Sequence, residues 1–206
     1  MYVVLNINNR PVKGPSAWTN SMQEYCGLVG NKGAPKLPYT LPNGQKLVGV
    51  DKRGPNEILK YQKAVKSNEF FDGTNWVIEY EGQEIPTDQA KSIAWGELAS
   101  IRYNAEVGGI QFDTGNGFMM VDTQRDTQNI LMGASIKAKE DASRVVVWKL
   151  GNGVHANLDA STTIAVSDAV FNHVEACFAN EAVISEKIFN ANSNTALRLI
   201  DLTEGF

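Results

Sequence analysis

The spacing of apolar residues changes near Pro86. Before it, short β-branched and aromatic runs alternate with Gly, Asn and Pro; beyond it, apolar residues recur at helical spacing over longer stretches. This change predicts an α+β protein with two parts. Residues 1–86 form a turn-rich mixed N-terminal module, and residues 87–206 form a C-terminal domain of helices packed on β-hairpins.

The N-terminal module is expected to be built mainly from short strands. The predicted strands are Tyr2–Ile7, Lys46–Val50 and a hairpin with arms at 70–71 and 76–80 around Asp72-Gly73-Thr74-Asn75. Prolines 35, 38 and 42 predict an extended loop over residues 33–44, because proline fixes φ and lacks a donor. Two helices are expected, a short one within Ser16–Leu28 capped by Ser16 or Asn20, and one over Asn56–Lys66 opened by Pro55.

Beyond Pro86, helices and hairpins are expected to alternate. Thr87 is a good N-cap for a helix that ends near Gly108-Gly109. A hairpin over Gly109–Val121 follows, and then a helix capped by Asp122 or Thr123 that runs to about Lys139. A second hairpin is predicted from Val145–Trp148 and Val154–Leu158, with its turn at Gly151-Asn152-Gly153.

A long amphipathic helix follows this second hairpin. Asp159 is its predicted N-cap, and its length of about 30 residues exceeds the usual globular range. The apolar stripe consists of Val166, Val170, Val174, Cys177, Phe178, Ile184 and Ile188. Such a helix is expected to pack on a sheet for part of its length and to pair with another helix, or project to a partner, over the rest. A short closing helix, Thr195–Ile200, is expected to be capped by Ser193 or Asn194.

Composition and charge narrow the class of protein. The 43% hydrophobic and 20% charged content is that of a globular chain, large enough for one large or two small domains. Residues 1–66 hold ten Lys and Arg against three Asp and Glu, but these cations are scattered, without interleaved stacking aromatics. We therefore expect no nucleic-acid partner. No segment resembles a signal peptide or a transmembrane helix, and the two distant cysteines favour a reducing cytosol.

The pair with the most chemical promise is His173 and Cys177, four residues apart on one face of the long helix. A zinc site needs three or four protein ligands, and the chain offers only His155 and Cys26 besides. A nucleophilic cysteine needs an exposed, electropositive setting, whereas Cys177 lies mid-helix and is followed by Phe178. Both residues are therefore interpreted as packing residues.

Other candidate chemistry is weaker. The acidic pairs Glu79/Glu81 and Glu140/Asp141 could serve glycoside hydrolysis, but sequence alone cannot give their separation. The turns at Gly108-Gly109, Gly115-Asn116-Gly117 and Gly151-Asn152-Gly153 lack phosphate-binding spacing. Trp76, Trp95 and Trp148 are interpreted as core anchors, while the role of Trp18 stays open. We assign no catalytic, cofactor-binding or metal-binding residue and expect no cofactor.

From Ile101 to its C-terminus the chain resembles a bacteriophage domain of unassigned function that occurs in tail-fibre-associated and tail-fibre assembly proteins. The resemblance is densest from Leu158-Asp159-Ala160 to His173-Val174-Glu175-Ala176-Cys177-Phe178 and Glu181. It is also carried by Arg102, Gly109-Ile110-Gln111-Phe112, Thr123, Gln128-Asn129-Ile130, Trp148-Lys149 and Ile200-Asp201-Leu202.

The resemblance implies a non-enzymatic tail-fibre assembly protein, a chaperone-like factor that binds the fibre in the host cytoplasm. The alternative is a structural virion component, such as an adaptor, cap or tip adhesin of the tail. An enzyme acting on surface glycan or peptidoglycan is the least favoured interpretation. The expected partners are a tail fibre or other tail protein, with self-association through the long C-terminal helix as a further possibility and no membrane.

Overall fold

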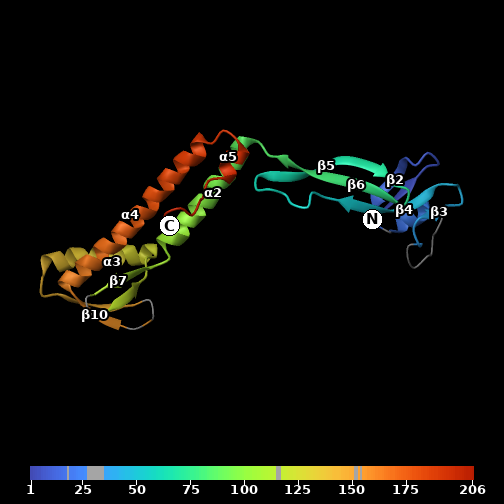
Figure 1. Cartoon of the computed structure of the whole chain (residues 1–206). Coiled ribbons are helices and arrows are strands. Elements are labelled where there is room, and N and C mark those ends of the chain that lie inside the picture. The colour runs from blue at the N-terminus through green and yellow to red at the C-terminus, as the bar shows by residue number, and fades with distance from the viewer. Residues whose placement is uncertain (18, 27–34, 115–116, 151–152, 154) are drawn as a thin grey trace. The chain divides into compact units, whose positions relative to one another are not determined.

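The computed structural model describes residues 1–17, 19–26, 35–114, 117–150, 153 and 155–206. The chain has an α+β fold and divides into two compact units, Met1–Ile85 and Pro86–Phe206 (Figure 1). Each unit contains both helix and strand, but the first is mainly a sheet and the second is mainly helical.

The first unit is a mixed sheet with one short helix. Its elements are β1 (Tyr2–Leu5), β2 (Pro11–Ser16), α1 (Asn20–Tyr25), β3 (Tyr39–Thr40), β4 (Lys46–Arg53), β5 (Gln62–Phe71) and β6 (Asn75–Glu84). The strand order is β2-β1-β4-β6-β5, and β3 pairs with β4. Only the β4–β6 pair is parallel, and the other described pairs are antiparallel.

The sheet of the first unit is stabilised by apolar side chains on both of its faces. Successive side chains point to opposite faces, so β1 and β4 contribute to two separate apolar clusters. One contains Val3, Leu5, Val48, Trp76 and Ile78. The other contains Val4, Leu41 and Leu47, with Met22 and Cys26 from the α1 region. The predicted core position of Trp76 is confirmed.

The helix predicted over Asn56–Lys66 is wrong. Residues 62–71 form β5, which pairs with β6 along the whole predicted hairpin and beyond it. Ile58 and Leu59, which suggested an apolar helical face, are exposed. Local spacing favoured a helix, but the ladder with β6 satisfies the backbone groups of β5. The sequence also missed β2, an edge strand, where Pro11 and Pro15 are tolerated.

The other first-unit predictions are confirmed in outline. The strand at Tyr2–Ile7 ends at Leu5, and the hairpin turn at Asp72-Gly73-Thr74-Asn75 is present. The short helix forms within the predicted range, but its cap is Thr19, whose Oγ1 accepts from the N–H of Met22. Trp18 lies outside the described residues.

The second unit alternates helices and two-stranded hairpins, as predicted. Its elements are α2 (Thr87–Glu106), β7 (Ile110–Asp113), β8 (Phe118–Val121), α3 (Arg125–Glu140), β9 (Val145–Lys149), β10 (His155–Asp159), α4 (Ala160–Asn190) and α5 (Asn194–Arg198). The turn residues 115–116 and 151–152, and Val154, lie outside the described residues.

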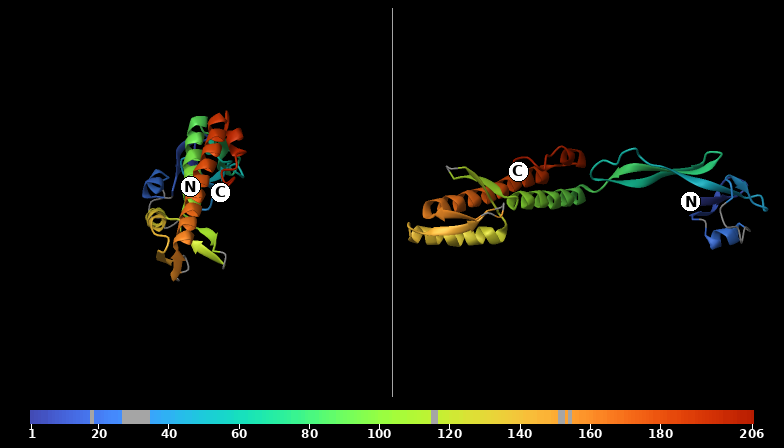
Figure 2. Two further views of the ribbon diagram at one scale, coloured as in Figure 1. Left: turned by 90° about the vertical axis from the view of Figure 1, so that its left-hand side faces the viewer. Right: turned by 90° about the horizontal axis from the view of Figure 1, so that it is seen from below.

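The 31-residue helix α4 is the spine of this unit. One half of α4 packs against α3 and the other half against α2 (Figure 2). The hairpins pack near the α3 end, where Val121, Leu131, Leu158, Val166 and Val170 are buried together. The prediction that α4 pairs with another helix over part of its length is confirmed.

Two predicted caps are present and two are wrong. Asp159 accepts from the N–H of Thr162 at 2.7 Å, and Ser193 caps α5. Thr87 is already helical, and α3 begins after Gln124, in both cases without a side-chain cap. Thr123 lies one residue before the N-cap position of α3, Gln124, and its Oγ1 accepts from the N–H of Gly109, at 2.9 Å.

Two predicted apolar contacts are wrong. Trp95 is 38% exposed and Phe178 is 46% exposed, so neither is a core anchor. Both lie beside the buried stripe of their helix, where the facing helix does not cover them. None of the helices in the described part of the chain is both long and apolar enough to cross a membrane.

Candidate functional site

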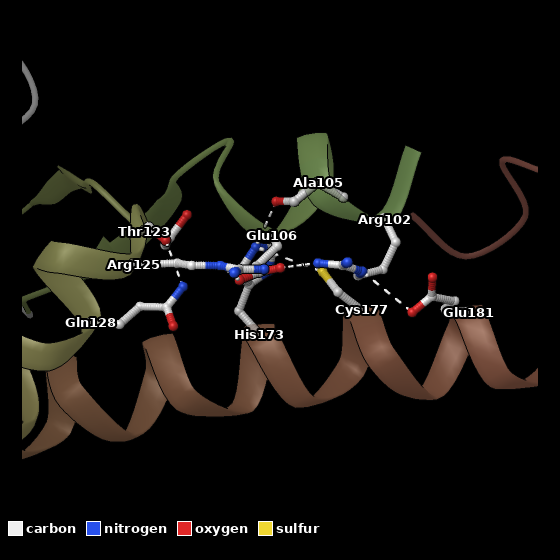
Figure 3. Close-up of polar contacts among 9 residues, drawn as sticks. All are labelled: Arg102, Ala105, Glu106, Thr123, Arg125, Gln128, His173, Cys177 and Glu181. Atoms are coloured by element: carbon white, nitrogen blue, oxygen red, sulfur yellow. Dashed lines mark hydrogen bonds and ion pairs between the residues drawn. The ribbon is translucent and has the colours of Figure 1, made fainter. Parts of the chain in front are cut away.

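The only buried acidic side chain among the described residues lies where α2 ends, α3 begins and both meet the middle of α4 (Figure 3). Glu106, in the last turn of α2, is 2% exposed. It accepts from Arg102, one turn earlier on α2, and from Nε of Arg125 at 3.2 Å, at the start of α3. One buried carboxylate therefore joins the ends of two helices. We call this region the junction.

The junction balances its charges across three helices. Nε of Arg102 lies 3.3 Å from the Glu181 carboxylate on α4, and its guanidinium lies 4.6 Å from the centre of the Phe178 ring. Arg125 likewise lies 5.6 Å from the ring of Tyr103. Two cations therefore face two anions, which offsets the cost of removing Glu106 and Arg102 from water.

His173 and Cys177 do meet at the junction, but not as a reactive pair. Nε2 of His173 lies 2.9 Å from the carbonyl oxygen of Ala105 and 3.9 Å from Sγ of Cys177. A carbonyl can only accept, so Nε2 carries a proton and donates it to Ala105. That nitrogen cannot act as a base toward the thiol.

The electrostatics of the thiol agree with this geometry. Burial raises the pKa of Cys177, and the neighbouring Glu106 carboxylate raises it further. A raised pKa keeps the thiol protonated and unreactive. The predicted packing role of Cys177 is confirmed by its burial. His173 has a more specific role than predicted, because it ties α4 to the last turn of α2.

A second set of hydrogen bonds attaches the first hairpin of the unit to α3. The Thr123 hydroxyl accepts from the N–H of Gly109, and Nε2 of Gln128 donates to the Thr123 carbonyl at 2.8 Å. Gly109 has a φ of 84°, and a Cβ there would lie 3.1 Å from the Val121 carbonyl oxygen. The entry to β7 therefore requires glycine.

The two acidic pairs suggested by the sequence do not form a catalytic site. Glu79 accepts from Asn68 and Glu81 is exposed, both on β6 of the first unit. Glu140 pairs with Lys137, and hydrogen bonds from the Ser143 hydroxyl and N–H lower the pKa of Asp141. These are the contacts of surface carboxylates. Among the described residues, no group of three His, Cys, Asp or Glu side chains is placed to hold a metal ion.

A different kind of site lies at the two hairpins of the second unit. Strand alternation turns Met119 and Val121 inward and leaves Phe118 74% exposed, with Met120 also exposed. On β9, Val147 is 67% exposed and Val145 is exposed beside it. A cleft of about 630 Å³, the hairpin cleft, lies between the hairpins and is lined by Phe118, Met119, Val145, Leu150, Ala156 and Leu158, among others.

The hairpin cleft also offers backbone groups. Each hairpin is a separate two-stranded sheet, so each of its strands pairs on one side only. Exposed apolar side chains beside unpaired strand edges are suited to contact with another chain.

The sequence did not indicate that the residues of the junction form one site. Its charged residues come from segments that are far apart in the chain, and no spacing rule connects Glu106 with Arg125 or Glu181. However, Arg102, Thr123, Gln128, His173, Cys177 and Glu181, which carry the resemblance stated above, are brought together there. The exposed side of β9 had no such signal, because Val145, Val146, Val147 and Trp148 are all apolar, and only the structure shows which of them face solvent.

The protein therefore has an α+β fold. Its mainly helical second unit combines the buried ion pairs of the junction with exposed apolar side chains on the hairpins. Residues 89–204, more than half of the chain, match the family described as "Domain of unknown function (DUF4376)". The chain belongs to this family, and the matched segment lies within the second unit. No curated protein and no solved structure matches the chain.

Proposed function

We propose that this protein is a non-enzymatic binding factor that assists the assembly of a bacteriophage tail fibre. The observation that carries the binding role is the hairpin cleft, where the exposed side chains of Phe118 and Val145 lie beside strand edges that pair with no other described strand. The choice of client rests on the tail-fibre resemblance of residues 101–206. Host cytoplasm during assembly is the corresponding location.

The chemistry of the cleft suits a strand-rich client. A segment of a folding fibre exposes backbone donors, acceptors and apolar side chains until its neighbours arrive. Such a segment can add as an extra strand to a hairpin edge, and apolar pockets then receive alternate side chains. The cleft is lined by six apolar side chains, together with polar groups such as Asn157 and Thr162.

The junction supports this role indirectly. It fixes the end of α2 and the start of α3 on α4, and the hydrogen bonds of Thr123 attach the β7–β8 hairpin to the same point. Ion pairs that involve a buried charge hold a defined arrangement of elements. We therefore assign Glu106 and Arg102 to positioning of the hairpins rather than to chemistry.

Co-expression with the fibre gene tests the proposal. The yield of soluble fibre trimer is measured with no partner, with the native chain, and with a Phe118→Ser, Val145→Ser variant. Ile130→Ser is the matched control, because Ile130 is 60% exposed on α3 but does not line the cleft. The native chain and the control should raise the yield, whereas the cleft variant should not. Equal yields in all four arms would contradict the proposal.

Purified particles provide a second test. An assembly factor that leaves the fibre should be missing from mature particles when they are measured by quantitative mass spectrometry. Stoichiometric presence in the particle would replace the assembly role with that of a structural tail component.

A further inference from the structure

Three phenylalanines form a row along the solvent side of α4. Phe171, Phe178 and Phe189 are spaced by seven and eleven residues, and at 3.6 residues per turn they fall within about 20° of one another around the helix. Their exposed fractions are 65%, 46% and 68%. The buried stripe of α4, with Val170, Cys177 and Ile184, lies about 120° away. We call this set the phenylalanine row.

One flank of the row is basic. Lys139 of α3 lines the same groove as Phe171, a cavity of about 350 Å³ between α3 and α4. Arg102 of α2 lies 4.6 Å from the ring centre of Phe178. Nζ of Lys91, also on α2, lies 5.7 Å from the ring centre of Phe189. Phe178 and Phe189 therefore each have a cation beside the ring, and Lys139 shares a groove with Phe171. Of these cations, Arg102 is already paired with Glu106 and Glu181, so Lys91 and Lys139 are the ones left to face a partner.

The other flank is acidic. Asp168, Glu175 and Glu186 lie three or four residues from a phenylalanine of the row, which places them about 40–60° beyond it, away from the buried stripe. All three are exposed. No ion pair to any of them is found within the described residues. Glu175 and Glu186 therefore face solvent on the side of the row away from the cations, whereas Asp168 also lines the groove that holds Lys139 and Phe171.

We propose that the phenylalanine row is a self-association surface on which copies of this chain pack with their α4 helices parallel. Rotation about an axis parallel to α4 brings the acidic flank of one copy against the basic flank of the next. An antiparallel face-to-face arrangement instead sets acid against acid. Opposite charge across the contact favours association, and like charge opposes it. The charge asymmetry thus selects both the partner and its direction.

The exposed rings supply less than half of the area that a standard interface buries. A phenylalanine buries about 150–250 Å², so the three exposed fractions amount to roughly 350 Å² of ring surface per copy. A standard interface buries about 800 Å² per partner. Met132 and Ile136 of α3, which are exposed and line the groove with Phe171, extend the apolar area on the same side.

Self-association through the row goes beyond the proposed function and does not depend on it. The row lies on α4, while Phe118, Val145 and Val147 lie on the hairpins. Both surfaces belong to the second unit and do not share these residues. Substitutions in the hairpin cleft should therefore leave the oligomeric state unchanged.

Sedimentation equilibrium of the full chain over a hundredfold concentration range tests the proposal. The native chain should show a mass above that of a monomer. Phe171→Glu, Phe189→Glu should weaken association by at least about tenfold, to a monomer over most of the range. Val183→Glu is the matched control, because Val183 is equally exposed on α4 but points about 120° away from the row. A native monomer at every concentration, or equal weakening by the control, would overturn the proposal.

Disulfide trapping tests the direction. Ser167 and Ser185 lie on the same side of α4, 18 residues apart, so about 27 Å separates them along the helix. In a parallel assembly, Ser167→Cys and Ser185→Cys should each cross-link to themselves under mild oxidation. Cross-linking only in a mixture of the two variants would show an antiparallel arrangement and overturn the assignment. Reversal of the acidic flank by Asp168→Lys, Glu175→Lys, Glu186→Lys should weaken association, and an unchanged mass would count against the charge argument.

Discussion

The junction and the exposed surfaces of the second unit place charged and apolar groups in opposite ways. At the junction, Glu106 is buried and Arg102 nearly so, each held by partners from other turns or helices. At the hairpins and along the phenylalanine row, large apolar side chains face solvent. Buried charge is costly unless it is paired, and exposed apolar area is costly unless it is covered. The comparison teaches that the charges of the first region are paired within the chain, whereas the apolar groups of the second are left uncovered by the chain itself, which is why we propose contacts with other chains there.

The largest effect is expected when the Glu106 carboxylate at the centre of the junction is removed. Glu106→Ala leaves Arg102 without its nearest partner in a buried site, and truncating one partner of a buried ion pair costs about 3–5 kcal/mol. Urea denaturation should show a loss of this size. Glu204→Ala, which breaks an exposed pair with Lys187, is the control and should cost less than about 1 kcal/mol. Similar losses for both variants would show that the junction is not the stabilising centre described.

Cys177→Ser tests the packing role of the thiol. The serine hydroxyl occupies a buried site beside His173, whose Nε2 already donates to Ala105, so a cost of about 1–3 kcal/mol is expected. The raised pKa of Cys177 further predicts slow alkylation of the native thiol at neutral pH. Loss of binding to the client with unchanged unfolding free energy would contradict a purely structural role.

Phe178 belongs to the phenylalanine row and also contacts Arg102 of the junction, so Phe178→Ala tests both regions. A fully buried phenylalanine would cost about 3–5 kcal/mol. Because Phe178 is half exposed, its main intramolecular contact is the Arg102 guanidinium, and the expected loss is about 1 kcal/mol. Thermal or urea unfolding at low protein concentration measures this value without a contribution from association. A loss near that of a buried ring would place Phe178 in the core.

The smallest expected effect is at the start of α4. Hydrogen bonds from the Thr162 N–H and then the Ser161 hydroxyl hold the pKa of Asp159 below its usual range. A lowered pKa in the folded state contributes stability above the ordinary carboxyl pKa of about 3.9, and this contribution is lost as pH falls through the folded value. The stability difference between the native chain and Asp159→Asn should therefore shrink as the pH falls below about 4. A difference that is constant with pH would show that the charge of Asp159 does not matter.

Much of the second unit could be predicted because its signals are local. The Asp159 cap, the apolar run from Val145 to Trp148 and the recurrence of Val166, Val170 and Cys177 each depend on residues within a few positions of one another. Helix and strand periods are properties of neighbouring residues, so the sequence alone identified these elements. The α+β class follows from the same periods.

Only the tertiary structure decided the features that depend on residues far apart in the chain. Pairing with β6 made residues 62–66 part of a strand, although the pattern of residues 56–66 favoured a helix. The Thr123 hydroxyl accepts from the distant N–H of Gly109, and the packing of α2 and α3 on α4 leaves Trp95 and Phe178 exposed while it buries Glu106. The physical reason is that burial and hydrogen-bond partners depend on which segments meet in space. The sequence by itself determined the helices and hairpins of the second unit, and their packing determined which charges are buried and which aromatic rings remain exposed.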